Sequence, residues 1–331
     1  MEKQDDLTLM KPRSYRRVLA AGFRLYTENF RRFFKASWQM VLLYAVSCGA
    51  LGTLSAIKIP EMTTMMMQQM MFTQTLSWEL IQQYLLTAVE LLALTLLAIA
   101  TMSLASATLL NKLSEHKETG SISTPVHWLT ATPRLMGRTM KGVFLTLLVL
   151  FIPMAFFFAL LALADYLSPQ FTIRHITTVL ITFGISTLIV ALLALPLTTV
   201  LMKYIMEATS GYWRTLGQCY GRGLRHWGLL FLVYFISLLM VELASLLVMM
   251  PAHILNFANQ QAHTGLLIGD PLGMPSYILP LTFFTFMFCS WIDFYILQVT
   301  LVHNYYLYGS IETEETERKE LGSLPKNLGE E

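Results

Sequence analysis

Six long apolar stretches, separated by shorter polar segments, are the main feature of the hydropathy pattern. They cover residues 36–57, 85–110, 142–164, 176–202, 228–250 and 276–302. A helix of about 20 residues crosses a hydrocarbon layer of roughly 30 Å, so each stretch is long enough to span a membrane. Stretches such as Leu91–Ala100 are apolar on every face, whereas strands of a membrane barrel alternate apolar and polar positions. The pattern therefore predicts an all-α, polytopic helical membrane protein with six transmembrane helices.

Composition supports this class and argues against an enzyme. Hydrophobic residues make up 55% of the chain and charged residues 13%, whereas about a quarter of the residues in soluble domains are charged. The sequence contains no HExxH, nucleophile elbow, phosphate loop or dinucleotide motif, so we expect no catalytic residues and no cofactor. Cys48, Cys219 and Cys289 do not form close-spaced pairs, and we expect three free thiols.

Basic residues are distributed unevenly between the connections. All but Lys58 and Arg174 of the 23 Lys and Arg residues lie before the first span, in the second and fourth connections, or after the last span. Because connections rich in Lys and Arg stay in the cytoplasm, both termini are predicted to be cytoplasmic. The polar, basic start of the chain does not resemble a signal peptide, so the first span is expected to be an uncleaved anchor.

The basic residues also indicate an internal repeat. An amphipathic segment precedes each odd-numbered span and ends in two basic residues three positions apart: Arg32 with Lys35, Arg138 with Lys141, and Arg222 with Arg225. The pattern predicts three pseudo-repeats, each a basic amphipathic interfacial helix followed by an outward and an inward span. They cover about 14–113, 125–204 and 211–308, within a single transmembrane domain of residues 1–310.

The segment after this domain, residues 311–331, carries seven acidic and three basic residues and almost no aromatic ones. It is predicted to be a disordered cytoplasmic tail. A protein partner could dock on this tail or on the cytoplasmic face, and no binding of nucleic acid is expected.

The basic pairs have two interpretations. The amphipathic helices can anchor the protein to anionic headgroups, at about 1 kcal/mol per nearby basic residue. Alternatively, the three helices surround a cytoplasmic opening and bind a phosphate-bearing lipid or partner, with Gly217 and Gly221 allowing close approach of the backbone. Both interpretations make membrane lipids, anionic ones among them, the expected partners.

Two further groups of residues are candidates for chemistry. Glu90, Glu242 and Asp293 lie inside spans, where an ionised side chain costs roughly 2.5–3.5 kcal/mol. They either form structural hydrogen bonds or belong to a proton or cation path.

Met62, Met66 and Met70 recur every four residues between the first two spans. Thioethers are soft ligands for Cu(I), although such a stripe also suits ordinary helix packing.

The arrangement of basic amphipathic segments and paired spans over residues 14–308 resembles the membrane domain of the glycerophosphodiester phosphodiesterase family and its stand-alone relatives. The soluble segments of this chain are too short for the catalytic barrel domain of the full-length enzymes, so no catalytic residue carries over. The resemblance implies a multi-pass protein of the bacterial cytoplasmic (inner) membrane. We expect a non-enzymatic scaffold or accessory in envelope or lipid homeostasis; the alternative is a transporter or channel, with copper handling as a narrower version.

Overall fold

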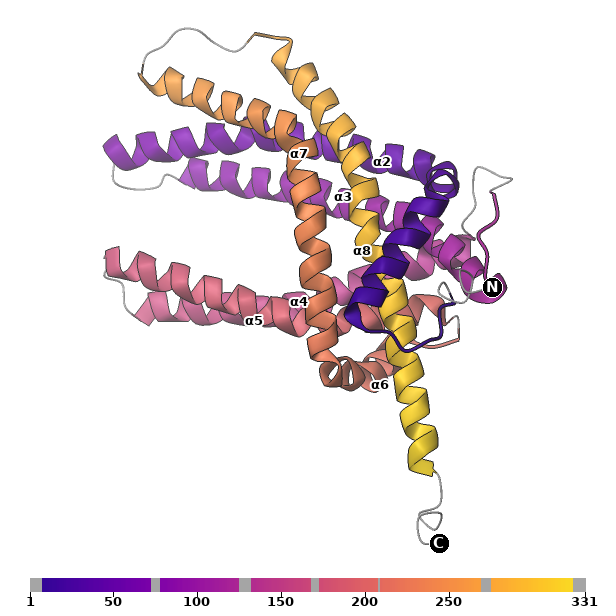
Figure 1. The fold of residues 1–331 in the computed structure, drawn as a ribbon. Coiled ribbons are helices and arrows are strands. Elements are labelled where there is room, and N and C mark those ends of the chain that lie inside the picture. Colours follow the sequence, from indigo (N-terminus) through magenta and orange to yellow (C-terminus); the bar gives the residue numbers. More distant parts are fainter. Residues whose placement is uncertain are drawn as a thin grey trace, which may run out of the picture.

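The computed structural model describes residues 8–72, 78–124, 132–167, 173–207, 209–268 and 275–323. Within these ranges, only the backbone is described for residues 66–72, 80, 156–167, 173–180, 266–268 and 322–323. The described residues contain seven helices and no strands (Figure 1). The helices are α2 (Tyr15–Phe72), α3 (Trp78–Thr119), α4 (Pro133–Leu167), α5 (Ile173–Met206), α6 (Tyr212–Arg225), α7 (Trp227–Ile268) and α8 (Ile278–Ser323).

All of these helices except α6 are long and apolar enough to cross a membrane. This confirms the predicted all-α, polytopic fold, since each of the six contains one predicted span. Only 11% to 33% of the most apolar window of each helix is buried within the protein. Most of the apolar surface is therefore left to contact lipid.

The basic segments do not all form separate helices. Helix α2 is 58 residues long and continues through the first basic segment into the span, because no glycine or proline interrupts residues 23–48. Helix α4 likewise contains both its basic pair and its span. Only α6 is separate: the chain leaves helical geometry at His226 (φ −96°, ψ 21°), between Gly223 and Gly228. The break occurs here because glycine weakens a helix and one glycine lies on each side of His226.

The prediction of a disordered tail over residues 311–331 is partly wrong. Helix α8 continues beyond the last span to Ser323, so residues 311–323 are helical. Ile311 and Glu315, four residues apart, are both buried at 5% exposure. This contact with the rest of the protein stabilises the end of the helix. Residues 324–331 lie outside the described ranges.

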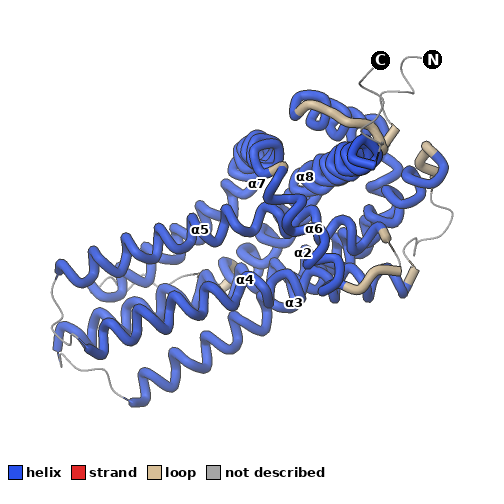
Figure 2. The backbone as a smooth tube through the Cα atoms, turned by 90° about the horizontal axis from the view of Figure 1, so that it is seen from below, coloured by secondary structure: helices blue, strands red, loops and turns tan. Residues whose placement is uncertain are grey.

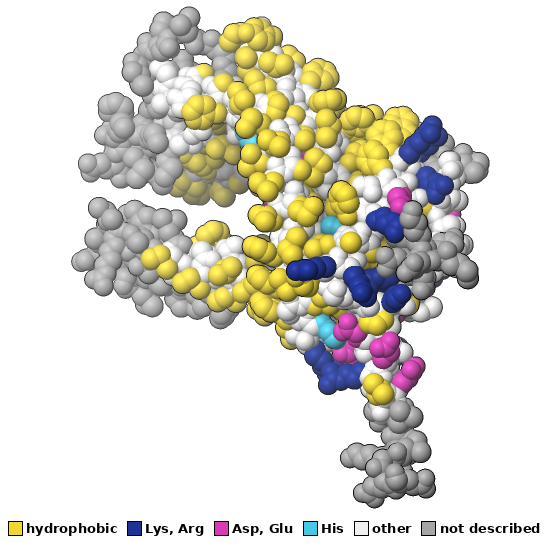
Figure 3. All heavy atoms as spheres, viewed as in Figure 1, with side chains coloured by type: hydrophobic (Ala, Val, Ile, Leu, Met, Phe, Trp, Pro, Cys, Tyr) yellow, Lys and Arg dark blue, Asp and Glu magenta, His cyan; other side chains and the backbone are white. Residues whose placement is uncertain are grey.

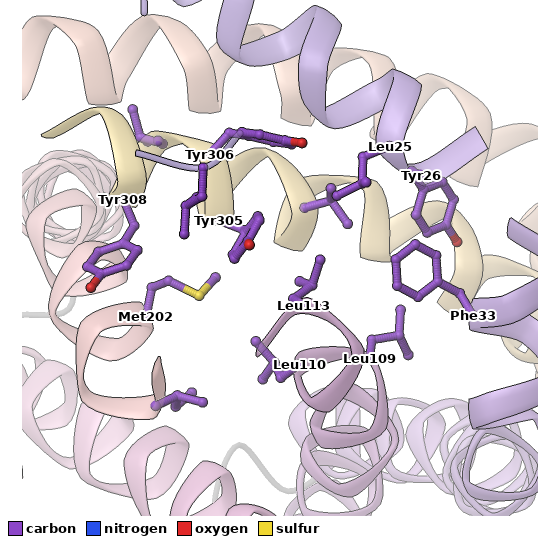
Figure 4. Packing of buried hydrophobic residues seen from close by; sticks show 14 of the residues in the cluster. Leu25, Tyr26, Phe33, Leu109, Leu110, Leu113, Met202, Tyr305, Tyr306 and Tyr308 are labelled. Carbon is purple, nitrogen blue, oxygen red and sulfur yellow. The ribbon is translucent and has the colours of Figure 1, made fainter. Parts of the chain in front are cut away.

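The largest buried cluster lies at one end of the molecule, which we call the basic end. It is formed by the first part of α2, the last turns of α3 and α5, and the second half of α8. Figure 4 shows its main side chains, among them Leu25, Phe33, Leu109, Leu113, Met202, Tyr305 and Tyr306. Lys and Arg side chains gather on the surface of the same end (Figure 3).

The helices are not a parallel bundle. The α2–α3 and α4–α5 hairpins extend from the basic end to the same side (Figure 1), and α8 and the first part of α7 cross the α4–α5 hairpin at a steep angle. Figure 2 agrees, because it views α8 and the first part of α7 nearly along their axes while α4 and α5 lie across the view. The molecule is therefore packed most tightly at the basic end.

A buried arginine fixes the segment before α2 at this end. Arg13 is 5% exposed, and its guanidinium lies over the Tyr306 ring, 5.1 Å from the centroid. The guanidinium donates to the carbonyl oxygen of Leu9 at 3.0 Å, and the Arg13 amide donates to Ser310 Oγ at 2.9 Å. These contacts join the N-terminal segment to α8.

Candidate functional site

Helix α6 packs on α5 through one narrow face. Its buried residues follow helical spacing: Tyr212, Thr215, Cys219 and Gly223. A Cβ atom at Gly223 would lie 2.9 Å from Cβ of Pro196 on α5, so only glycine allows this close approach. The sequence thus places a small residue where the two helices meet.

Two aromatic side chains hold α6 and the start of α7 in this position. Tyr220 donates its hydroxyl to the carbonyl oxygen of Leu193 at 3.1 Å, and Trp227 Nε1 donates to that of Leu192 at 3.4 Å. Both acceptors lie on α5, within the span. The amphipathic helix is therefore bound to the end of a membrane span.

The neighbouring face of α6 forms one wall of an apolar groove of about 510 Å³. The groove is lined by Val149, Leu150 and Pro153 from α4, Val190, Leu193 and Leu197 from α5, and Trp213, Leu216, Gly217, Tyr220 and Gly221 from α6. Trp213 is 59% exposed, and a Cβ atom at Gly217 or Gly221 would meet no atom within 4 Å. The groove is therefore open along the α6 backbone.

A basic residue borders the open part of the groove. Arg214 precedes Gly217 by three positions and Gly221 by seven, so the three residues lie on one face of α6. Arg214 is exposed. Helix spacing thus places an exposed arginine next to the open part of the apolar groove, an arrangement that suits a molecule with an apolar chain and an anionic group.

Of the three predicted basic pairs, the second is partly used to cap a helix. The Arg138 guanidinium donates to the carbonyl oxygens of Tyr204 at 2.7 Å, Glu207, and Ser210 at 2.8 Å, and lies over the Tyr204 ring. Tyr204 lies in the last turn of α5, where carbonyl oxygens lack partners within the helix, and Glu207 and Ser210 lie in the segment that follows it. Arg138 is thus a structural cap, while Lys141 is exposed.

The third pair contacts the acidic end of α8. Arg222 lies 3.5 Å from Glu312, which also accepts from Lys203 at 2.7 Å. Arg225 donates to both carboxylate oxygens of Glu315, at 2.9 and 3.1 Å. The structure therefore gives Arg222 and Arg225 carboxylate partners within the chain.

His226 completes this contact. Its ring nitrogens lie 3.1 Å from Glu315 and 3.4 Å from Glu314. Glu315 lies beyond the predicted span 276–302. Burial acts to raise the pKa of its carboxyl, but the hydrogen bonds from His226 and Arg225 outweigh burial and hold the pKa below its usual range.

The first pair lies on the surface of α2. Arg32 donates to Asn29 Oδ1 at 2.8 Å, and Lys35 is exposed. The three pairs are consequently used in different ways, and Arg138, Arg222 and Arg225 have partners in the protein itself.

The acidic residues of the spans lie in different surroundings. Glu90 on α3 and Glu242 on α7 are exposed on the outer surface. Asp293 on α8 is half-buried close to Tyr44 and Cys48, and its buried Oδ1 has no hydrogen-bond partner among the described residues. The structure does not bring the three carboxylates into one site.

The methionine stripe is described only in part. Met62 is half-buried on α2, and its carbonyl oxygen accepts from Tyr84 at 2.6 Å. The side chains of Met66 and Met70 lie outside those described, so the copper site stays a prediction. Cys48, Cys219 and Cys289 are free thiols, as predicted.

Sequence reasoning identified α6, Gly217 and Gly221 but missed the other walls of the groove. Val149, Val190 and Leu197 belong to spans that are apolar on every face, so no pattern marks the side that packs against α6.

Comparison of the chain with family models, with curated proteins and with solved structures finds no match.

Proposed function

We propose that this integral membrane protein binds an anionic phospholipid in the α6 groove and acts as a non-enzymatic scaffold or accessory in lipid or envelope homeostasis. The observation that carries this proposal is the groove itself, with its apolar walls from α4, α5 and α6. The groove lies beside two spans, where lipid chains are the most abundant apolar ligands. Arg214 at its edge favours an anionic headgroup.

The location of the span carboxylates supports this proposal over the transporter alternative. Glu90 and Glu242 are exposed on the outer surface of the helices, whereas residues of a transport path face the interior of the bundle or a water-filled cavity. Asp293 alone of the three is half-buried.

Filling the groove tests the proposal. Gly221→Leu places a side chain in the open space above α6. It should reduce occupancy of this groove at least tenfold, which native mass spectra of the detergent-purified protein show as the loss of one bound phospholipid. Gly184→Leu is the matched control, because Gly184 on α5 also has no atom within 4 Å of an added Cβ and does not line the groove. Unchanged lipid occupancy in a folded Gly221→Leu variant would refute the proposal.

The headgroup part has a separate test. Arg214→Gln should weaken binding of added phosphatidylglycerol by about fivefold and leave binding of phosphatidylcholine unchanged, since one charge contact is worth about 1 kcal/mol. Equal effects on both lipids would show that Arg214 does not recognise the anionic headgroup.

A further inference from the structure

The first part of α2 repeats the residue pattern of α6. Aromatic and basic residues of α2 recur 190 positions later in α6: Phe23 and Trp213, Arg24 and Arg214, Phe30 and Tyr220, Arg32 and Arg222, Lys35 and Arg225. Both segments are helical and occur at the basic end. The correspondence extends over the length of α6 and raises the question of whether the two helices form equivalent sites.

Their buried faces also correspond. Gly22, Leu25 and Phe33 are buried in α2, and they stand 190 positions before the buried Tyr212, Thr215 and Gly223 of α6. Glycine again permits close packing, since a Cβ atom at Gly22 would lie 2.3 Å from Cδ2 of His303 on α8. Helix α2 therefore packs on α8 through the same face that α6 uses on α5.

The equivalent neighbouring face of α2 forms a second apolar groove, of about 390 Å³. Its walls are Phe23, Tyr26, Thr27, Phe30 and Phe34 from α2, and Trp291, Ile292, Tyr295, Ile296 and Val299 from α8. Phe23 is 48% and Phe30 42% exposed. The wall residues from α8 lie near the end of a span, as do those from α5 in the α6 groove.

Most polar atoms of the α2–α8 groove are bonded within the protein. Tyr26 donates to the carbonyl oxygen of Tyr295 at 2.7 Å, and Thr27 donates to that of Phe23 at 2.9 Å. Trp291 Nε1 is buried and has no hydrogen-bond partner among the described residues. The groove thus presents an aromatic, apolar wall.

A basic stripe runs beside this groove. Arg17, Arg24, Arg31 and Lys35 recur at steps of seven and four residues and so lie on one face of α2. Arg24 pairs with Glu28 at 2.9 Å, whereas Arg31 and Lys35 are exposed. This stripe lies about a quarter of a helical turn from the groove face that contains Phe23, Thr27 and Phe34.

We infer that the α2–α8 groove is a second binding site for an anionic phospholipid, with an acyl chain against the aromatic wall and the headgroup phosphate against Arg31 and Lys35. The charge complementarity of the stripe selects the headgroup, and the apolar wall selects the chain. The site shares its ligand class with the proposed function but rests on its own residues. The protein then holds two lipids, one at each groove.

Counting retained lipids tests this inference. Thr27→Trp fills the α2–α8 groove, and native mass spectra in the presence of phosphatidylglycerol should lose one of two retained lipids. Gly221→Leu should remove the other, and the double variant both. Thr316→Trp is the control, because Thr316 is also exposed on a helix and also donates to the carbonyl oxygen four residues earlier, at 2.8 Å.

The outcomes separate the two sites. Two lipids retained by folded Thr27→Trp would overturn the second site and leave the α6 groove unaffected, whereas two lipids retained by Gly221→Leu would overturn only the site in the α6 groove.

A phosphatidylglycerol with a photoreactive acyl chain should label residues 23–34 and 291–299 in the wild type. Its labelling there should fall at least fivefold in Arg31→Gln/Lys35→Gln, and unchanged labelling in that variant would overturn headgroup recognition.

Discussion

Arg225 on α6 donates two hydrogen bonds to Glu315 on α8, at 2.9 and 3.1 Å, across 90 residues of sequence. The side chain of Arg225 is 51% exposed, whereas that of Glu315 is only 6% exposed. The contact joins the acidic end of α8 to the helix that forms the α6 groove. It also explains why residues 311–323 are helical although their composition resembles that of a solvated tail.

The contribution of this pair can be measured with a double-mutant cycle. Arg225→Gln and Glu315→Gln should each destabilise the protein, with a coupling free energy of about 1 kcal/mol, because the arginine is half-exposed and the interaction is screened. Chemical unfolding in detergent gives the free energies. A coupling energy of zero would show that the pair does not hold α8 against α6.

Arg138 should be important for stability. Arg138→Gln removes donors from the carbonyl oxygens of Tyr204, Glu207 and Ser210 and should cost about 2–3 kcal/mol of unfolding free energy, since hydrogen bonds to a charged group are strong. The exposed Arg134 on the same helix provides the control variant Arg134→Gln, which should change stability by less than about 0.5 kcal/mol. Equal losses in the two variants would contradict the capping role.

Close packing at Gly22 predicts a large effect of a single methyl group. Gly22→Ala would force its Cβ to within 2.3 Å of Cδ2 of the buried His303, and overpacking of this kind costs about 1–3 kcal/mol. Gly137→Ala, where an added Cβ meets nothing within 4 Å, should be neutral or slightly stabilising. Thermal unfolding of the two variants measures both effects. An unchanged unfolding temperature in Gly22→Ala would contradict the close contact.

The exposed position of Glu242 leads to an unusual expectation for a charged residue. Glu242→Leu should keep or raise the unfolding temperature in lipid nanodiscs, because it removes an ionisable side chain from an apolar surface that faces lipid. Leu243→Ala, at the exposed neighbouring residue, is the comparison. A strong loss of stability in Glu242→Leu would show that this carboxylate has a structural partner outside the chain.

The sequence alone determined the membrane class, the six spans and the position of the amphipathic α6. These features follow from local properties, because a run of apolar residues and the spacing of polar ones along a helix do not depend on distant contacts. The basic pairs and the glycines at 217 and 221 were also visible in the sequence, as was the recurrence of the α2 pattern in α6.

Tertiary structure decided how those residues are used. Arg138, Arg222 and Arg225 all looked like headgroup contacts, but their partners are the end of α5 and the carboxylates of α8, which only folding brings near. The walls that Val190 and Trp291 supply were equally hidden, because a transmembrane helix is apolar on every side. The side that faces a neighbour is set by packing geometry between helices far apart in the sequence, and not by hydrophobicity.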